Sequence, residues 1–168
     1  PLSFFAGIGG LSSRGILVKG ANVIDDLAKV KQVIMDKTGT LTSGKFAVEE
    51  VLSTADKDQL ILDAAYAEHF SNHPIAQGIK EACHSEIHDE EVTDVQEIAG
   101  RGLSVKVNGE EILAGNYKLM SEKGVQCKEE TSTGTLVYVA KNGVYEGCLV
   151  LRDQLKEDAK EAVDTLHK

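Results

Sequence analysis

The chain has 168 residues, of which 42% are hydrophobic and 27% charged, enough for one good hydrophobic core or two small ones. Its formal net charge is −9 and no Lys/Arg cluster stands out, which argues against a nucleic-acid partner. No segment is long enough to span a membrane and none resembles a signal peptide. Cys83, Cys127 and Cys148 lie far apart in the sequence and are interpreted as reduced thiols.

The spacing of apolar residues in the first half predicts short elements followed by two helices. Thr54 or Asp56 can cap the first of these two helices, and Ser71 or Asn72 the second, whose first turn contains Pro74. Gly44 predicts a break in the chain. The expected elements are a helix over 22–30, a strand over 31–35, a strand over 45–52, a helix to about residue 70 and a helix from there to about residue 84.

From residue 92 the apolar period changes to two, which predicts strands. Asn108-Gly109 and Asn142-Gly143 are strong signals for tight hairpins. The expected strands cover 92–99, 103–107, 111–114, 135–140 and 144–151, with helices over 116–123 and 156–166. Residues 44–147 are therefore expected to form a compact α/β unit, two helices against an antiparallel sheet, inserted between flanks that belong to one further domain.

The run Asp36-Lys37-Thr38-Gly39-Thr40-Leu41-Thr42 is the most informative feature of the sequence. It places one carboxylate after the apolar residues 33–35, directly before a turn rich in small hydroxyl residues. Such a turn supplies backbone N–H groups and hydroxyls to phosphate oxygens, while the carboxylate can attack phosphorus. The alternative is a buried strand that ends in an ordinary side-chain-stabilised turn.

This run resembles the phosphorylation motif of P-type cation-transporting ATPases. The resemblance implies that Asp36, Lys37 and Thr38 lie in the catalytic site, that Asp36 accepts the γ-phosphoryl group of ATP, and that Asp36 and the Thr38 carbonyl bind Mg²⁺ in a site incomplete in this chain. Simple phosphatases of the haloacid-dehalogenase superfamily usually carry a second Asp two residues after the nucleophile. Thr38 stands there instead, which disfavours a soluble phosphatase, the main alternative.

A second set of residues follows in a fixed order. Each member has a structural alternative: His73-Pro74 can begin a helix, Glu68 can be a solvated charge, and Gly100-Arg101-Gly102 can be a tight turn. Together they resemble the nucleotide-binding signature of heavy-metal P-type ATPases. The residues of this chain that match the signature are Glu68, Ser71, His73, Pro74, Gly100, Gly102, Gly115 and Asn116. The resemblance implies that Glu68 and His73 contact adenine, that Gly100 and Gly102 allow close backbone approach, and that Gly115 and Asn116 shape the far wall.

The resemblance covers nearly the whole chain and implies its organisation. Residues 1–21 would be a segment leaving a membrane helix, the alternative being a poorly ordered leader. Residues 22–43 and 148–168 would be parts of an incomplete haloacid-dehalogenase-like Rossmannoid phosphorylation domain, and 44–147 the nucleotide-binding domain inserted into it. Asp153 is either close to the phosphorylation site or the N-cap of the final helix.

The resemblance also implies ligands and partners. They are ATP or ADP, Mg²⁺, and the transmembrane and actuator domains of a parent pump, with this fragment on the cytoplasmic face of the membrane. The leader is more similar to the zinc/cadmium/cobalt/lead branch than to the copper branch. Because other catalytic loops of the family are missing from the sequence, the isolated fragment is expected to hydrolyse little ATP. A stand-alone nucleotide-binding module is the second alternative.

Overall fold

The computed structural model describes residues 2–54 and 56–167. Pro1, at the start of the predicted leader, and Lys168, in the predicted final helix, lie outside the described residues. The chain divides into two compact units, Pro1–Met35 and Asp36–Lys168. The four-segment domain division expected from the sequence stays a prediction.

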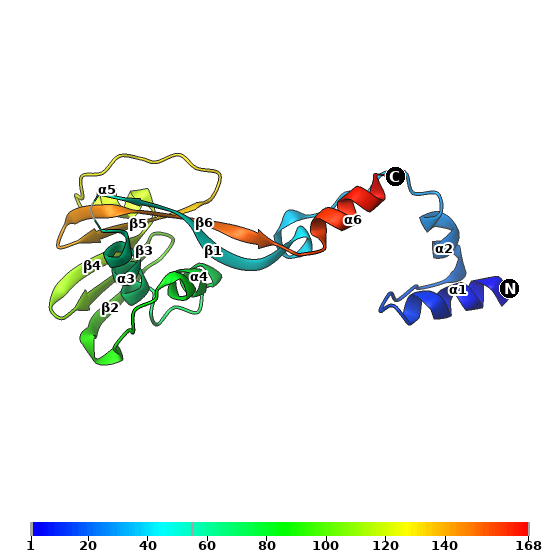
Figure 1. Ribbon diagram of the computed structural model, residues 1–168, viewed down its shortest axis with the longest axis horizontal. Helices are drawn as coiled ribbons and strands as arrows, with labels where there is room; N and C mark the ends of the chain where they lie inside the picture. The colour runs from blue at the N-terminus through cyan, green and yellow to red at the C-terminus, as the bar shows by residue number, and fades with distance from the viewer. Residues whose placement is uncertain (1, 55, 168) are drawn as a thin grey trace. The chain divides into compact units, whose positions relative to one another are not determined.

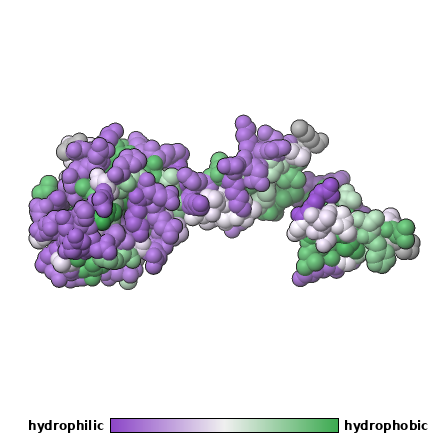
Figure 2. Space-filling view, turned by 60° about the horizontal axis from the view of Figure 1, so that its bottom comes forward, coloured by the Kyte–Doolittle hydropathy of each residue, from purple (hydrophilic) through white to green (hydrophobic). Residues whose placement is uncertain are grey.

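The first unit contains two short helices. Helix α1 spans Leu2–Ser12 and α2 spans Ala21–Leu27, and neither contains a buried residue. Exposed apolar side chains include Leu2 (86%) and Phe5 (73%), and apolar residues cover much of the face of this unit seen in Figure 2. In the part of the chain that is described, no helix is both long and apolar enough to cross a membrane.

The strand expected over residues 31–35 is absent, so this prediction was wrong. The segment before Asp36 has no regular structure, and Ile34 is 89% exposed. A β-strand requires a neighbouring strand for its ladder of hydrogen bonds. The residues that the structure describes offer residues 31–35 no such partner, so their apolar pattern does not produce a strand.

The second unit is built on a six-stranded antiparallel sheet, with strand order β1-β6-β5-β4-β3-β2 (Figure 1). The strands are β1 (Thr42–Ser53), β2 (Val92–Ile98), β3 (Gly102–Val107), β4 (Glu110–Gly115), β5 (Thr135–Lys141) and β6 (Val144–Leu155). The helices are α3 (Lys57–Ala67), α4 (Pro74–Ala82), α5 (Tyr117–Glu122) and α6 (Ala159–Leu166), and η1 (Lys37–Leu41) and η2 (Asp89–Glu91) are single turns. The predicted α/β fold class with an antiparallel sheet and a helix pair is confirmed.

Strands β1 and β6 extend beyond the rest of the sheet. Strand β5 pairs with β6 only as far as Leu151, whereas β1 continues to pair with β6 up to Thr42 opposite Leu155. The two strands therefore form a ribbon that has η1 and α6 at its end (Figure 1). Gly44, where the sequence predicted a break, instead lies inside β1 at a register shift, with φ of +74°. A glycine tolerates this conformation, so the strand bends and continues.

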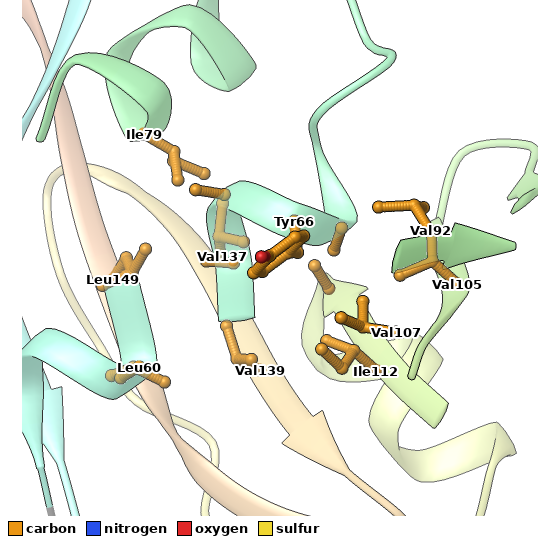
Figure 3. Packing of buried hydrophobic residues seen from close by; sticks show 14 of the residues in the cluster. Leu60, Tyr66, Ile79, Val92, Val105, Val107, Ile112, Val137, Val139 and Leu149 are labelled. Carbon is orange, nitrogen blue, oxygen red and sulfur yellow. The ribbon is translucent and has the colours of Figure 1, made fainter. Parts of the chain in front are cut away.

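Hydrophobic residues fill both faces of the sheet. Helices α3 and α4 cover one face, where Tyr66 lies among Val105, Val107, Ile112 and other apolar side chains (Figure 3). The Tyr66 hydroxyl donates a hydrogen bond to the carboxylate of Glu91, which satisfies its one polar group. On the other face, α5 contributes to a smaller cluster of seven residues: Leu113, Leu119, Met120, Val125, Tyr138, Ala140 and Cys148.

Two features explain how the helix pair is positioned. Asp56 caps α3 by accepting a hydrogen bond from Asp58 N at 2.9 Å, as one of the two predicted caps. Gly78 lets α4 lie close to β1, because a Cβ there would be 2.3 Å from the Phe46 carbonyl oxygen. Helix α3 ends at Ala67 rather than near residue 70, since the chain must turn there to place α4 beside it.

Two carboxyl groups, buried Asp63 and half-buried Glu146, lie between α3 and the β5–β6 hairpin. Asp63 is 2% exposed and accepts from Gln59 Nε2 at 3.0 Å. Burial and then the negative charge of Asp63 raise the pKa of Glu146 from an ordinary 4.5 to about 7, and Lys141 opposes this rise. Lys141 Nζ lies 3.6 Å from Asp63 Oδ1 and 3.0 Å from Glu110 Oε2.

Glu146→Gln is expected to stabilise the protein at neutral and higher pH. A carboxyl whose folded pKa is raised costs stability as pH rises from 4.5 to about 7, and the cost is complete above that window. We expect the free energy of unfolding at pH 8 to rise by about 1–2 kcal/mol, after a reduction for solvent screening, with little change at pH 4.5. Urea unfolding at both pH values measures this, with exposed Glu129→Gln as control. An equal effect at both pH values would place the cause elsewhere.

Candidate functional site

A cavity of about 710 Å³ lies between the α3–α4 connection and the ends of β2, β3 and β4. Its size is in the range of roughly 300–1,000 Å³ that is usual for small-molecule sites. It is lined by Ala67, Glu68, Phe70, Ser71, Asn72, His73, Ile75, Val95, Glu97, Ile98, Gly100, Arg101, Gly102, Leu103 and Asn116.

His73 is held at the edge of the cavity by the start of α4. It is the N-cap of this helix, and its Nδ1 accepts a hydrogen bond from Ile75 N at 3.2 Å. The predicted caps, Ser71 and Asn72, were therefore wrong: Ser71 Oγ instead accepts from His73 N at 3.3 Å. Because Nδ1 is the acceptor, we assign the proton of a neutral ring to Nε2, which leaves Nε2–H as a donor. Pro74 occupies the first helical position, where its missing N–H has no cost.

Glu68 lies at the C-terminus of α3 and is 9% exposed. Burial raises the pKa of its carboxyl, and the Ser71 hydroxyl together with the charges of His73 and Lys80 lowers it in part. Glu97, on the opposite wall, raises this pKa further. Glu68, for which a solvated charge was the structural alternative, is thus a largely desolvated carboxyl beside the His73 ring, and the two side chains can form directional hydrogen bonds.

Lys80 fixes the connection between α3 and α4, a role that the sequence did not reveal. Its Nζ donates to the carbonyl oxygens of Ser71 at 2.9 Å and His69 at 3.2 Å. Lys80 follows His73 by seven residues, or two helical turns, so the two side chains lie on the same face of α4. This spacing is the signal in the sequence that could have suggested a role for Lys80 near the site. The lysine holds the backbone that carries Glu68 and His73 in one conformation.

The wall opposite is formed by two strand ends in close contact. Asn116 caps α5 by accepting from Leu119 N at 3.0 Å, and its Nδ2 donates to Gly100 O at 2.9 Å. A Cβ on Gly102, whose φ is +145°, would lie 2.1 Å from Ala114 O, and a Cβ on Gly115 would lie 2.3 Å from Arg101 O. Packing between β3 and β4 thus requires both glycines, independently of any ligand.

The run that was predicted to be a phosphorylation motif forms a separate turn. Asp36 is exposed, and one of its oxygens, Oδ1, accepts from Lys37 N at 2.7 Å. Lys37 and Thr38 belong to η1, a single wide turn in which Gly39 has φ of +76°. None of the three predicted catalytic residues lines the cavity.

Asp153 and Lys156 hold this turn from the end of β6. The hydroxyl of Thr42 donates to Asp153 Oδ2 at 2.5 Å, while Gly44 N donates to Oδ1 at 3.0 Å. Lys156 Nζ donates to Gly39 O at 3.0 Å. The interpretation of Asp153 as a helix cap was wrong, because it lies within β6 and Asp158 is at the N-cap position of α6. Residues more than 100 positions apart therefore stabilise the turn after Asp36.

The structure thus separates the predicted residues into two places. Pro74, which begins α4, and Gly115, which packs against the Arg101 backbone, do not line the cavity. The predicted residues that line it are Glu68, Ser71, His73, Gly100, Gly102 and Asn116. Mg²⁺ takes six oxygen ligands, of which this chain would supply the Asp36 carboxylate and the Thr38 carbonyl. Across residues 2–54 and 56–167, no three His, Cys, Asp or Glu side chains come together to hold a metal ion. These residues do not by themselves fit a complete Mg²⁺ site.

Known proteins are similar to this chain over its full length. A cadmium, zinc and cobalt-transporting ATPase of Bacillus subtilis (strain 168) is 45% identical over 168 residues. A zinc-transporting ATPase of Synechocystis is 41% identical over 170 residues, and a probable copper-exporting P-type ATPase of Archaeoglobus fulgidus is 39% identical over 179. The matches cover 99–100% of this chain but 22–24% of each relative, so the chain spans about a quarter of their length.

Solved structures agree in fold. Two crystal structures of a zinc-transporting PIB-type ATPase, solved in two different states, match with a TM-score of 0.78 and 29% and 30% identity. Each match covers 98% of this chain and 28% of the chain in the solved structure. In fold and sequence, the chain resembles the cytosolic domains of heavy-metal P-type ATPases, as its motifs predicted. A family model of haloacid dehalogenase-like hydrolases matches residues 30–168, and the chain belongs to this family.

Proposed function

We propose that this chain is the nucleotide-binding region and part of the phosphorylation region of a heavy-metal-exporting P-type ATPase, on the cytoplasmic face of its membrane. The cavity that joins Glu68 and His73 to the Gly100–Gly102 turn is the observation that carries the proposal. The relatives named for zinc, cadmium and cobalt transport support the branch. The transmembrane and actuator domains of the parent pump would be the partners of this region.

The polar groups of the cavity suit an adenine base. Adenine offers an amino donor and ring-nitrogen acceptors. The Nε2–H of His73 can donate to a ring nitrogen, and the Glu68 carboxylate can accept from the amino group. The raised pKa of Glu68 means that ionisation of this carboxyl is costly in the free site, and an amino donor would offset part of that cost.

In the parent enzyme, Asp36 would act as the nucleophile. An oxygen of its carboxylate forms a bond to the γ-phosphorus of ATP, the bond from that phosphorus to the bridging oxygen breaks, and ADP leaves. The products are an aspartyl-phosphate and ADP. The exposed carboxylate at the start of a turn supports this assignment, and Thr42, Asp153 and Lys156 would keep the turn in position.

Titration of the 168-residue chain with ADP, followed by backbone amide shifts, tests nucleotide binding. We expect shifts at Glu68, His73, Gly100, Gly102 and Asn116. His73→Gln should raise the Kd for ADP about tenfold by removing one directional hydrogen bond to the base. It should cost about 1 kcal/mol of folding stability, because His73 also caps α4.

Exposed His84→Gln is the matched control and should change neither quantity. If the His73→Gln protein is unfolded, the role of His73 is purely structural. Phosphate-ester hydrolysis by the chain, without amide shifts in the cavity, would contradict the proposal and favour a haloacid-dehalogenase-type phosphatase.

A further inference from the structure

Phe70 is an exposed aromatic residue inside the cavity, and neither the sequence motifs nor the polar groups of the site account for it. Phe70 is 54% exposed, although the face of its unit seen in Figure 2 is largely hydrophilic. It lines the same cavity as Glu68 and His73. Phe70 lies near the end of a predicted helix, and the sequence offered no reason to distinguish it from an ordinary core residue.

The ring of Phe70 is supported from behind. It packs against the His69 ring edge-on, with centroids 4.9 Å apart and planes at 67°. His69 Nε2 lies 2.6 Å from Asp89 Oδ1, and Lys80 Nζ holds the carbonyl oxygen of His69. The segment that carries Phe70 is therefore held in place by these contacts, while Phe70 itself remains 54% exposed. A ring held in this way loses little conformational freedom when a ligand binds to it.

A second exposed apolar side chain reaches the cavity from β2. Thr93 pairs with Lys106 and Gln96 with Ser104, so that Asp94 and Val95 together oppose the single residue Val105. Asp94 has φ of +50°, and its Oδ2 accepts from Lys106 Nζ at 2.8 Å. Such a bulge redirects a side chain. Val95, 44% exposed, lines the cavity as Phe70 does.

We infer that Phe70 stacks on the nucleobase, with Val95 as an apolar contact from β2, and that this pair makes the site selective for purines. The inference rests on the proposed function and adds its base-recognition surface. Polar groups at Glu68 and His73 read the edge of a base, but a planar base also needs an apolar surface against its face. Among side chains, an aromatic ring provides this surface with the largest gain in binding free energy, because a base stacks on it.

Phe70→Leu keeps the apolar bulk and removes the aromatic face. We expect the Kd for ADP to rise about tenfold and the Kd for UDP, which stacks less strongly, to rise less. Phe70→Tyr should bind ADP as the unchanged chain does. The base protons of bound ADP should show an upfield ring-current shift with the unchanged chain and with Phe70→Tyr, and this shift should disappear in Phe70→Leu.

Val95→Ala should weaken ADP binding to a smaller extent, and Val144→Ala, at a still more exposed valine away from the cavity, should not affect it. The Kd for pyrophosphate, which lacks a base, should be the same in all variants. If Phe70→Leu binds ADP within about twofold of the unchanged chain while His73→Gln binds it weakly, the inference is wrong and the proposed function stands. If the unchanged chain does not bind ADP, both are wrong.

Discussion

Asp36→Asn in the proposed full-length pump is expected to abolish transfer of label from γ-labelled ATP to the protein. The amide that replaces the carboxylate is a poor nucleophile, so no acyl-phosphate forms, and we expect residual labelling to fall by about a thousandfold or more. Asp36 is exposed and accepts a local hydrogen bond from Lys37 N, so its replacement should leave the fold unchanged. Acid-quenched gel assays of the labelled protein measure the outcome.

Asp26→Asn is the matched control, because Asp26 is an exposed carboxylate in α2 that forms a weak ion pair with Lys29 at 4.0 Å. It should leave labelling intact. Persistent labelling of the Asp36→Asn protein would show that another residue accepts the phosphoryl group. The isolated 168-residue chain should hydrolyse ATP slowly or not at all, since its described residues present an incomplete Mg²⁺ site.

Gly102→Ala is expected to destabilise the second unit by about 3 kcal/mol or more. The new Cβ would lie 2.1 Å from Ala114 O and 2.5 Å from Gly115 Cα, both of them backbone atoms that cannot move without opening the β3–β4 pairing. The φ of +145° adds strain for any residue with a side chain. Urea unfolding followed by circular dichroism measures the loss.

Gly109→Ala provides the comparison. Gly109 also has a positive φ, of +85°, but a Cβ there would meet no atom within 4 Å, so the expected cost is about 1 kcal/mol. A stable Gly102→Ala protein that fails to bind ADP would assign this glycine to ligand approach rather than to strand packing. Similar losses in the two variants would show that the backbone conformation matters more than the contact with β4.

Local features were predicted well from the sequence. The Asn108-Gly109 hairpin formed with φ of +52° and +85°, as a tight turn between β3 and β4 requires. Asp56 caps α3, as one of the two caps that the sequence offered for this helix. Each of these depends on residues within four positions of one another. The strand expected over residues 31–35 was wrong because its apolar pattern says nothing about whether a partner strand is present.

The cavity shows what could not be predicted from the sequence. The sequence motifs predicted Glu68, His73 and the Gly100–Gly102 turn as parts of one site, and the fold brings them to one cavity. They did not reveal that Nδ1 of His73 caps α4, that Lys80 holds the preceding segment, or that Phe70 and Val95 reach the same space. Phe70 resembled a core residue in the sequence, because burial depends on what covers a side chain after the helices have packed.

The sequence by itself determined the family, the turn after Asp36 and the order and type of most elements, because these depend on short-range patterns of charge, turn residues and hydrophobic period. Only the tertiary structure decided which side chains share a cavity and that Asp153 contacts Thr42, 111 positions away. Those contacts follow from the register of β1 on β6 and of β2 on β3, including the bulge at Asp94. Register is set by packing between distant segments, and a shift of one residue would turn each side chain to the other face of the sheet.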